Sequence, residues 1–258
     1  MKIAVCVKQV PDTADIKWTE NNTIQREGVE SVINPFDTYA VESALRLKDK
    51  YKNVEINALT MGPPQAEEII RKAISLGVDG GFVVCDKKFA GADTFATGKT
   101  LATAIKKVLG NSDIILCGQF AIDGDTAQTG PTLASNLGYA VVTYVKEIVE
   151  VGDNYITVKK EIEDGIETLR VKLPAVLCVQ KCDFEVRRPL IEGFIKSQKA
   201  EIKKYSLQDL DLPAESVGIK GSPTFVSRAF RPEQKKQCEI FENDIDSAID
   251  KIVEVLNG

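Results

Sequence analysis

The chain has 258 residues, of which 43% are hydrophobic, enough for one large α/β domain or two small ones with a packed core. Its formal net charge of −5 gives it no electrostatic footprint for nucleic acid, and no apolar run is long enough to insert into a membrane. The sequence contains no histidine, which excludes catalytic triads, general bases and metal sites built on that residue.

The cysteine pattern favours reduced, buried thiols over a disulfide framework. The six cysteines are scattered, and several lie inside strand-like runs: Cys6, Cys85, Cys117, Cys178, Cys182 and Cys238. They form no CxxC pair of the kind that zinc or iron–sulfur sites use. We therefore expect no metal ligand and no catalytic side chain in this chain, and an organic cofactor has to carry any redox chemistry. The N-terminus opens directly as a strand without a signal-peptide pattern, so we expect a cytoplasmic protein.

Strands and helices alternate over the first half of the chain. Apolar runs predict strands at residues 2–8, 54–60, 82–85 and 113–117. Periodicity and capping signals predict helices at residues 35–51, 65–76, 94–109 and 132–138, and an irregular excursion or small hairpin at 17–33. This alternation predicts an α/β fold with a doubly wound, mostly parallel sheet, whose ligands lie at the carboxyl ends of the strands. Four loops qualify as ligand loops, those after Val7, Thr60, Cys85 and Cys117.

From Tyr139 onward, strand patterns follow one another without helices between them. They cover residues 141–151, 155–162, 167–173 and 175–179, with hairpin turn residues at 152–154 and 163–165. We expect these strands to extend the same sheet as an antiparallel addition. Beyond Lys181 the core-like pattern ends, and only residues 243–256 form a clear amphipathic helix. We expect this tail to lie on a partner chain; wrapping of its own domain is the alternative.

Residues 117–131 combine a strand end, a loop and a helix start. Free backbone N–H groups and the dipole of a helix N-terminus favour a bound anion. The loop adds three side-chain donors, Thr126, Gln128 and Thr129. Two of its glycines let a ligand approach the backbone closely, Gly124 and Gly130. Two carboxylates can accept from a ribose or cap the helix, Asp123 and Asp125. An ordinary capped turn explains this spacing as well as a nucleotide site does, and for Asn34 helix capping and ligand contact are equally supported.

Residues 158–178 resemble the signature segment of the beta subunit of electron-transferring flavoproteins at every specified position. Residues 5–8, 34–37 and 123–131 also match, so that the resemblance covers essentially the whole chain. It implies a heterodimer with a larger alpha subunit and a nucleotide bound by this chain. The positions that match the family's nucleotide site are Cys6, Asn34, Phe36, Asp37, Met61, Asp123, Gly124, Asp125, Thr126, Ala127, Gln128, Thr129, Gly130 and Thr132.

The resemblance leaves two identities for that nucleotide. In simple members of the family it is AMP, held structurally in a non-bifurcating electron carrier. In electron-bifurcating members it is FAD, which takes a hydride from NADH. Electrons then pass to the alpha-subunit FAD and an acyl-CoA dehydrogenase-like flavoenzyme, and to ferredoxin or flavodoxin. The loop with small residues at Gly124 and Ala127 is similar to the bifurcating version, so we expect FAD.

Residues 188–195 resemble the family's partner recognition loop, with Ile191 at the position of its apolar anchor. No core-facing period accounts for four apolar residues there, Leu190, Ile191, Phe194 and Ile195. Some should therefore be exposed, as a docking hot spot requires, and we assign docking to Leu190, Ile191 and Phe194; the alternative is that Ile191 is a core residue. We expect a nucleotide-binding α/β domain (1–185), a partner recognition loop (186–204) and a C-terminal arm and helix that contact the alpha subunit (205–258).

A third hypothesis, an unrelated nucleotide-binding or hydrolase domain, rests on Gly98-Lys99-Thr100. This tripeptide is similar to the end of a P-loop, but Asp93 stands where the first glycine of that motif belongs. The hypothesis therefore lacks support.

Overall fold

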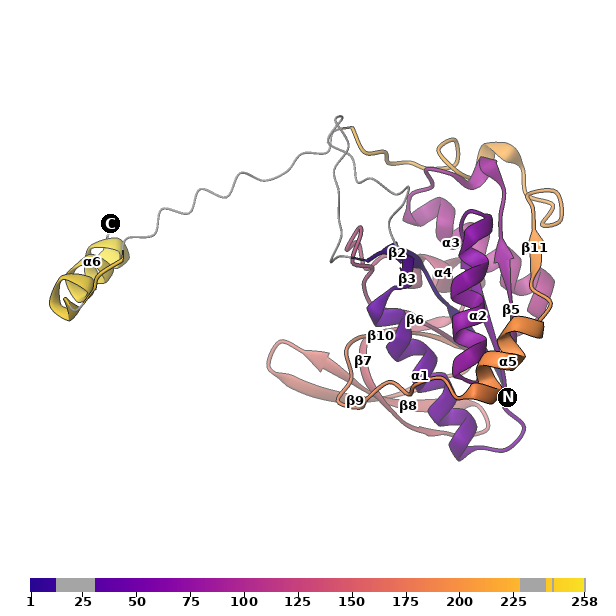
Figure 1. The fold of residues 1–258 in the computed structure, drawn as a ribbon, viewed down its shortest axis with the longest axis horizontal. Helices are drawn as coiled ribbons and strands as arrows, with labels where there is room; N and C mark the ends of the chain where they lie inside the picture. Colours follow the sequence, from indigo (N-terminus) through magenta and orange to yellow (C-terminus); the bar gives the residue numbers. More distant parts are fainter. Residues whose placement is uncertain (13–30, 228–239, 243, 258) are drawn as a thin grey trace.

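A nine-stranded sheet organises the protein (Figure 1). The computed structural model describes residues 1–12, 31–227, 240–242 and 244–257. The strands of the sheet are β1 (Lys2–Cys6), β4 (Glu55–Met61), β5 (Gly80–Val84), β6 (Ile114–Gly118), β7 (Ala140–Val151), β8 (Tyr155–Ile162), β9 (Gly165–Lys172), β10 (Ala175–Val179) and β11 (Lys203–Tyr205). Their spatial order is β11-β5-β4-β1-β6-β10-β7-β8-β9.

The predicted α/β architecture is confirmed, including its antiparallel extension. Strands β11 to β7 in this order pair in parallel, and β8 and β9 continue the sheet from β7 through antiparallel pairs. Of the four strands after Tyr139, only β10 departs from the expectation, because it pairs in parallel on both sides. Strand β10 inserts between β6 and β7 instead of pairing with β9. All five of its residues are apolar and buried, as in a strand covered on both faces.

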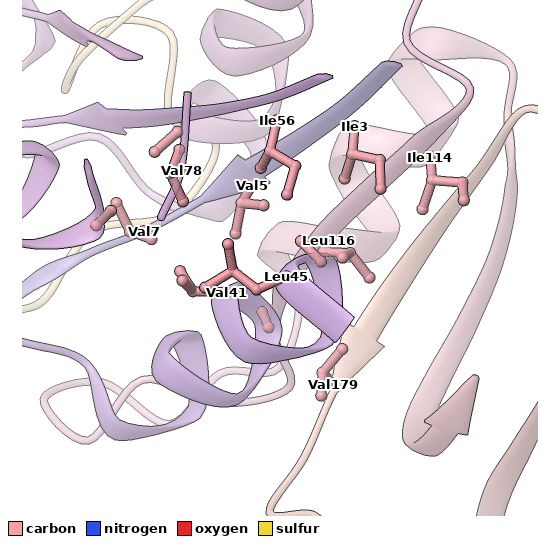
Figure 2. Close-up of a cluster of buried hydrophobic side chains, with 14 of the residues drawn as sticks. Ile3, Val5, Val7, Val41, Leu45, Ile56, Val78, Ile114, Leu116 and Val179 are labelled. Carbon is pink, nitrogen blue, oxygen red and sulfur yellow. The ribbon is translucent and has the colours of Figure 1, made fainter. Parts of the chain in front are cut away.

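Helices cover both faces of the parallel sheet. Helices α1 (Pro35–Lys50) and α2 (Glu67–Leu76) pack on one face, and α3 (Thr94–Ala104) and α4 (Thr129–Leu137) on the other. Helix α3 continues as a π-helical turn (Ile105–Leu109), and 3₁₀ turns lie at Pro64–Ala66, Lys87–Phe89 and Ala214–Ser216. Figure 2 shows Val41 and Leu45 of α1 against Val5 and Leu116 of the central strands. Successive strand residues alternate between the two cores, as period 2 requires.

The N-terminal excursion has the stem of a hairpin. Strand β2 (Gln9–Pro11) pairs antiparallel with β3 (Ser31–Ile33) as a separate two-stranded sheet. The rest of the predicted excursion, including residues 17–30, lies outside the described residues. None of the helices that the structure describes combines the length and the apolar composition needed to cross a membrane.

The chain beyond Lys181 first packs on its own domain. Helix α5 (Ile191–Lys199) packs beside α2, and β11 adds an edge strand to the sheet (Figure 1). Leu207, Leu210 and Val217 are then buried in the core on the α3 face. For residues 205–217 the structure therefore favours the alternative, in which the arm wraps its own domain. Helix α6 (Ile245–Asn257) lies apart from the sheet and exposes its apolar face, and its contact with another chain stays a prediction.

Candidate nucleotide site

A cavity lies at the point where the strand order reverses. Helices α1 and α2 lead the chain from β1 through β4 to β5, whereas α3 returns it to β6 on the other side of β1. In such sheets, ligands bind outside the carboxyl ends of the strands at this point. A cavity of about 1510 Å³ opens there, and all four loops expected from the sequence contribute to its wall.

Most of the predicted site residues share this cavity wall. They are Cys6, Asn34, Asp37, Met61, Asp123, Gly124, Asp125, Thr126, Ala127, Gln128, Thr129 and Gly130. Two predicted residues lie behind the wall. Phe36 packs edge-to-face on Phe120, with ring centroids 5.5 Å apart. Thr132 packs against Gly98 of α3, where a Cβ would come within 2.7 Å of its Cγ2. Phe36 and Thr132 therefore support the site from outside, and the P-loop-like tripeptide lies inside a helix.

The first turn of α4 faces the cavity without a side-chain cap. Its N-cap residue is Gln128, so neither Asp123 nor Asp125 caps the helix as one alternative had it. Ala127 and Asp125 adopt left-handed backbone conformations, with φ of 56° and 48°. The backbone N–H groups of this turn remain available to an anion. A Cβ on Gly124 would meet nothing within 4 Å, so a ligand can approach the backbone there.

Gly130 has a packing role that the sequence did not indicate. A Cβ at this position would lie 2.2 Å from Cys178 Sγ and 3.0 Å from Cys117 Sγ. The absence of a side chain therefore lets α4 pack closely on β6 and β10, whereas close approach of a ligand to Gly130 stays a prediction. The two sulfur atoms are 3.7 Å apart, and the described cysteines are free thiols, as predicted. The contact with Cys178 and burial raise the pKa of the Cys117 thiol, which keeps it protonated.

Asp37 joins the ends of the two central strands. Its Oδ2 accepts from the backbone N–H of Lys8 (2.7 Å) after β1, and its Oδ1 accepts from that of Gly118 (2.8 Å) in β6. Gly118 is required here because a Cβ would lie 2.4 Å from Oδ1. Asp37 is only 5% exposed, and burial raises its pKa to about 7 against the lowering effect of these two hydrogen bonds. The Asp37 carboxyl group therefore holds the ends of β1 and β6 together and titrates near neutral pH.

Asn34 and Lys8 fasten the loop that follows β6. The buried Asn34 side chain donates to the carbonyl of Phe120 (2.7 Å) and accepts from the N–H of Ile122 (3.3 Å). Asn34 is the N-cap residue of α1, as one alternative had it, but its side chain makes no capping bond and binds the loop instead. Lys8 Nζ donates to Asp123 Oδ1 at 2.6 Å. These contacts connect the corner between β1 and α1 to the loop, which fixes its path over the cavity.

A strained tyrosine supports the other side of this loop. The backbone N–H of Tyr144 donates to Oε1 of the buried Gln119 (2.7 Å), and the Tyr144 ring packs edge-to-face on Phe120. Tyr144 has φ of 58°, which costs of the order of 1–3 kcal/mol for a bulky residue. The sequence reading missed Tyr144, because its strand pattern gives no signal of left-handed backbone.

The C-terminal arm reaches the wall of the cavity. Asp93 Oδ1 accepts from Ala96 N–H and so caps α3. Its Oδ2 accepts from both the N–H (3.1 Å) and the hydroxyl (2.8 Å) of Thr224. Thr224, Phe225 and Val226 thereby reach the cavity wall. The sequence reading missed these three residues because the arm has no periodicity. Among the described residues, no cluster of three cysteine or carboxylate side chains can hold a metal ion.

Comparisons with known proteins identify the family of the chain. The model of the electron transfer flavoprotein domain family matches residues 21–210. The chain is 41% identical to the electron transfer flavoprotein subunit beta of Megasphaera elsdenii over 99% of its own length and 98% of the relative's. It is 42% identical to the caffeyl-CoA reductase-Etf complex subunit CarD of Acetobacterium woodii (91% and 89%) and 41% identical to protein FixA of Azorhizobium caulinodans (92% and 86%). The chain belongs to the beta-subunit family of electron transfer flavoproteins.

Proposed function

We propose that this chain is the NADH-oxidising subunit of an electron-bifurcating flavoprotein complex and that it binds FAD in the cavity at the ends of β1 and β6. Bound FAD would accept a hydride from NADH and pass on single electrons. One electron would go toward the alpha-subunit FAD and the other toward ferredoxin or flavodoxin. The chain acts in the complex and not alone. A non-bifurcating carrier subunit that holds AMP is the alternative.

The size of the cavity is the observation that carries this proposal. Small-molecule sites typically enclose about 300–1000 Å³. A cavity of about 1510 Å³ exceeds the needs of a mononucleotide and has room for a dinucleotide with a second nucleotide beside it. Its wall includes residues of the α4 loop and the arm residues Thr224–Val226, so both segments lie within reach of a long ligand.

The residues of the wall fit a flavin dinucleotide. The N-terminus of α4 and the side chains of Thr126, Gln128 and Thr129 would hold its diphosphate, since all three are hydrogen-bond donors on the cavity wall. Gly124 leaves open space for close approach, and the small Ala127 tolerates a left-handed conformation that a β-branched residue would resist. The chain's own task is to bind and orient the cofactor and to exclude water around it.

The partners follow from the family and from two exposed apolar surfaces. Beta subunits of this family pair with an alpha subunit, and the apolar face of α6 supplies a surface for it. Leu190, Ile191 and Phe194 are 76%, 80% and 57% exposed, which supports docking of an acyl-CoA dehydrogenase-like flavoenzyme there. CarD is named as a subunit of a complex with a CoA-ester reductase, which supports a partner of that class. We propose a cytoplasmic location for this complex.

An anaerobic NADH titration of the heterodimer tests this function. We expect NADH to bleach flavin bound to this chain in the purified complex. Gln128→Leu removes one donor from the wall and should lower the flavin content of this chain and the amplitude of bleaching, while the alpha-subunit flavin stays. Asn136→Leu, an exposed amide-to-leucine change on α4 outside the cavity wall, is the matched control. Full flavin content and full bleaching in the Gln128→Leu complex would contradict the assignment of the loop.

A further inference from the structure

Helix α5 buries its small residues and exposes its large apolar side chains. Gly193 and Ser197, one turn apart, face α2: Ser197 is 1% exposed, and a Cβ on Gly193 would lie 2.3 Å from the Ser75 carbonyl oxygen. The large apolar side chains of this segment point to solvent instead, namely those of Leu190, Ile191, Phe194 and Ile195. Burying one such side chain is worth about 1.5–3 kcal/mol. Folding stability alone would therefore turn the helix the other way, so its orientation serves another purpose.

Arg71 of α2 fastens the C-terminal end of α5. Its Nη1 donates to the carbonyl oxygens of Ser197 (2.5 Å), Gln198 (3.3 Å) and Ala200 (3.3 Å). Its Nε and Nη2 donate to Glu67 Oε1 one turn away, at 3.1 and 2.6 Å. The guanidinium group thus satisfies the last carbonyls of the helix and is itself held in place.

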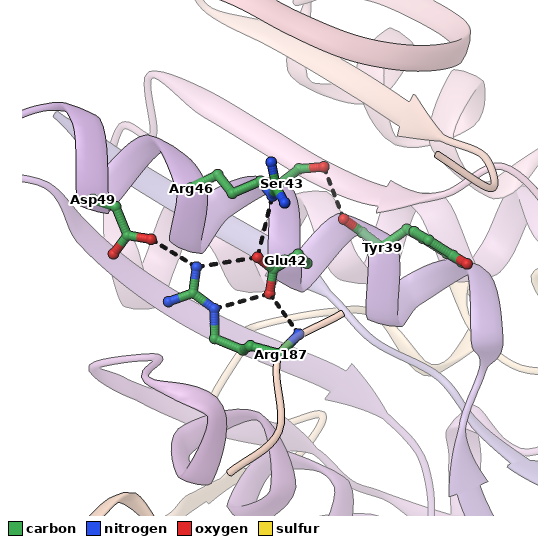
Figure 3. A network of polar contacts seen from close by, with 6 residues as sticks. All are labelled: Tyr39, Glu42, Ser43, Arg46, Asp49 and Arg187. Carbon is green, nitrogen blue, oxygen red and sulfur yellow. Dashed lines mark hydrogen bonds and ion pairs between the residues drawn. The ribbon is translucent and has the colours of Figure 1, made fainter. Parts of the chain in front are cut away.

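Arg187 fastens the chain just before α5 (Figure 3). Its Nε and Nη2 donate to the two oxygens of Glu42 at 2.9 and 3.1 Å, and Nη2 also donates to Asp49 at 2.7 Å. Its backbone N–H donates to Glu42 as well. Glu42 is only 3% exposed, so the carboxylate of this bidentate pair with α1 is shielded from water. The segment is therefore fixed on both sides of its exposed apolar face.

We infer that Gly193 and Arg71, together with the Arg187–Glu42 pair, are positioning residues that preorganise α5 for a partner flavoenzyme. The inference rests on the proposed docking role of residues 186–204. The same segment carries three exposed cations, Arg188, Lys196 and Lys199, and one exposed carboxylate on α5, Glu192, so its apolar face fits an apolar pocket with a mainly acidic rim. Holding the helix in place before contact removes the cost of ordering it on binding.

Steady-state coupling tests this inference in the heterodimer. The partner is an acyl-CoA dehydrogenase chosen because it couples to the wild-type complex. Gly193→Ala places a Cβ against Ser75 and displaces α5, although alanine favours helix by about 1 kcal/mol. We expect the KM for the dehydrogenase to rise about tenfold, with unchanged kcat and flavin content. Gln198→Ala changes an exposed side chain on the same helix and keeps the backbone carbonyl that Arg71 binds, so it should leave KM unchanged.

A second pair of variants separates positioning from folding. Arg71→Met should raise KM as Gly193→Ala does, whereas Arg71→Lys, which keeps a donor near the carbonyls, should restore part of the coupling. An unchanged KM in both Gly193→Ala and Arg71→Met would overturn the inference. If the Gly193→Ala chain does not assemble with the alpha subunit, the KM of the Arg71→Met complex alone decides the test. Ile191→Ala tests the docking role of the segment separately from the positioning role of Gly193 and Arg71. If this variant also leaves KM unchanged, the docking role itself is refuted.

Discussion

The contact of α4 with two buried thiols makes Gly130→Ala a demanding test of the nucleotide site. The added methyl group would lie 2.2 Å from Cys178 Sγ, and both sulfur atoms are buried between strands and helix, so they cannot retreat to solvent. Overpacking of this kind costs about 1–3 kcal/mol, and the better helix propensity of alanine returns at most about 1 kcal/mol. We expect a net loss of about 1–2 kcal/mol in unfolding free energy and a lower nucleotide content, because the first turn of α4 moves.

A second substitution checks this reasoning. Cys178→Ala removes the sulfur atom nearest to the new methyl group, so Gly130→Ala should cost little in that background. The double-mutant cycle should give a favourable coupling of about 1–3 kcal/mol. Thermal unfolding and nucleotide content of the four heterodimers are the assays. Additive effects would refute the packing argument, as would a Gly130→Ala complex with full stability and full nucleotide content.

Two further predictions concern the residues that hold the strand ends and the loop. Burial raises the pKa of Asp37 from 3.8 to about 7, so the folded chain holds a proton that the unfolded chain lacks between these pH values. The contribution of Asp37 to the unfolding free energy should therefore fall as pH rises from about 4 to 7. Asp37→Asn should reduce this pH dependence of the unfolding free energy, measured by urea unfolding at a series of pH values. An unchanged pH dependence would contradict the raised pKa of Asp37. Asn34→Leu leaves the Phe120 carbonyl and the Ile122 N–H without their partner, which should cost about 1–3 kcal/mol in thermal unfolding and speed nucleotide loss on dialysis. Wild-type nucleotide retention would show that the loop does not depend on Asn34.

The order of helices and parallel strands was predictable because the pattern is local. Apolar runs of strand length alternate with helical periodicity up to residue 138, and the structure has the same elements with shifted boundaries. The position of β10 was not predictable in this way. Its neighbours along the chain suggested an antiparallel meander, whereas its wholly buried composition belongs between two parallel strands.

The location of the site was predictable, but the roles of several residues were not. The strand ends gather most of the candidates because parallel strands share one carboxyl edge. Asn34 and Gly130 instead depend on residues far along the chain, at Phe120 and Cys178. The orientation of α5 likewise depends on contacts between residues that are far apart in the sequence. Its exposed apolar residues were expected, but that Gly193 is its contact with α2 appears only in three dimensions.

The nucleotide content of the purified heterodimer tests the central claim most directly. The complex is denatured, and the released nucleotides are separated by chromatography and counted per heterodimer. Our account predicts two FAD molecules and no AMP, because the cavity of this chain would hold the second flavin. One FAD together with one AMP would contradict it and would identify the chain as the subunit of a non-bifurcating electron carrier.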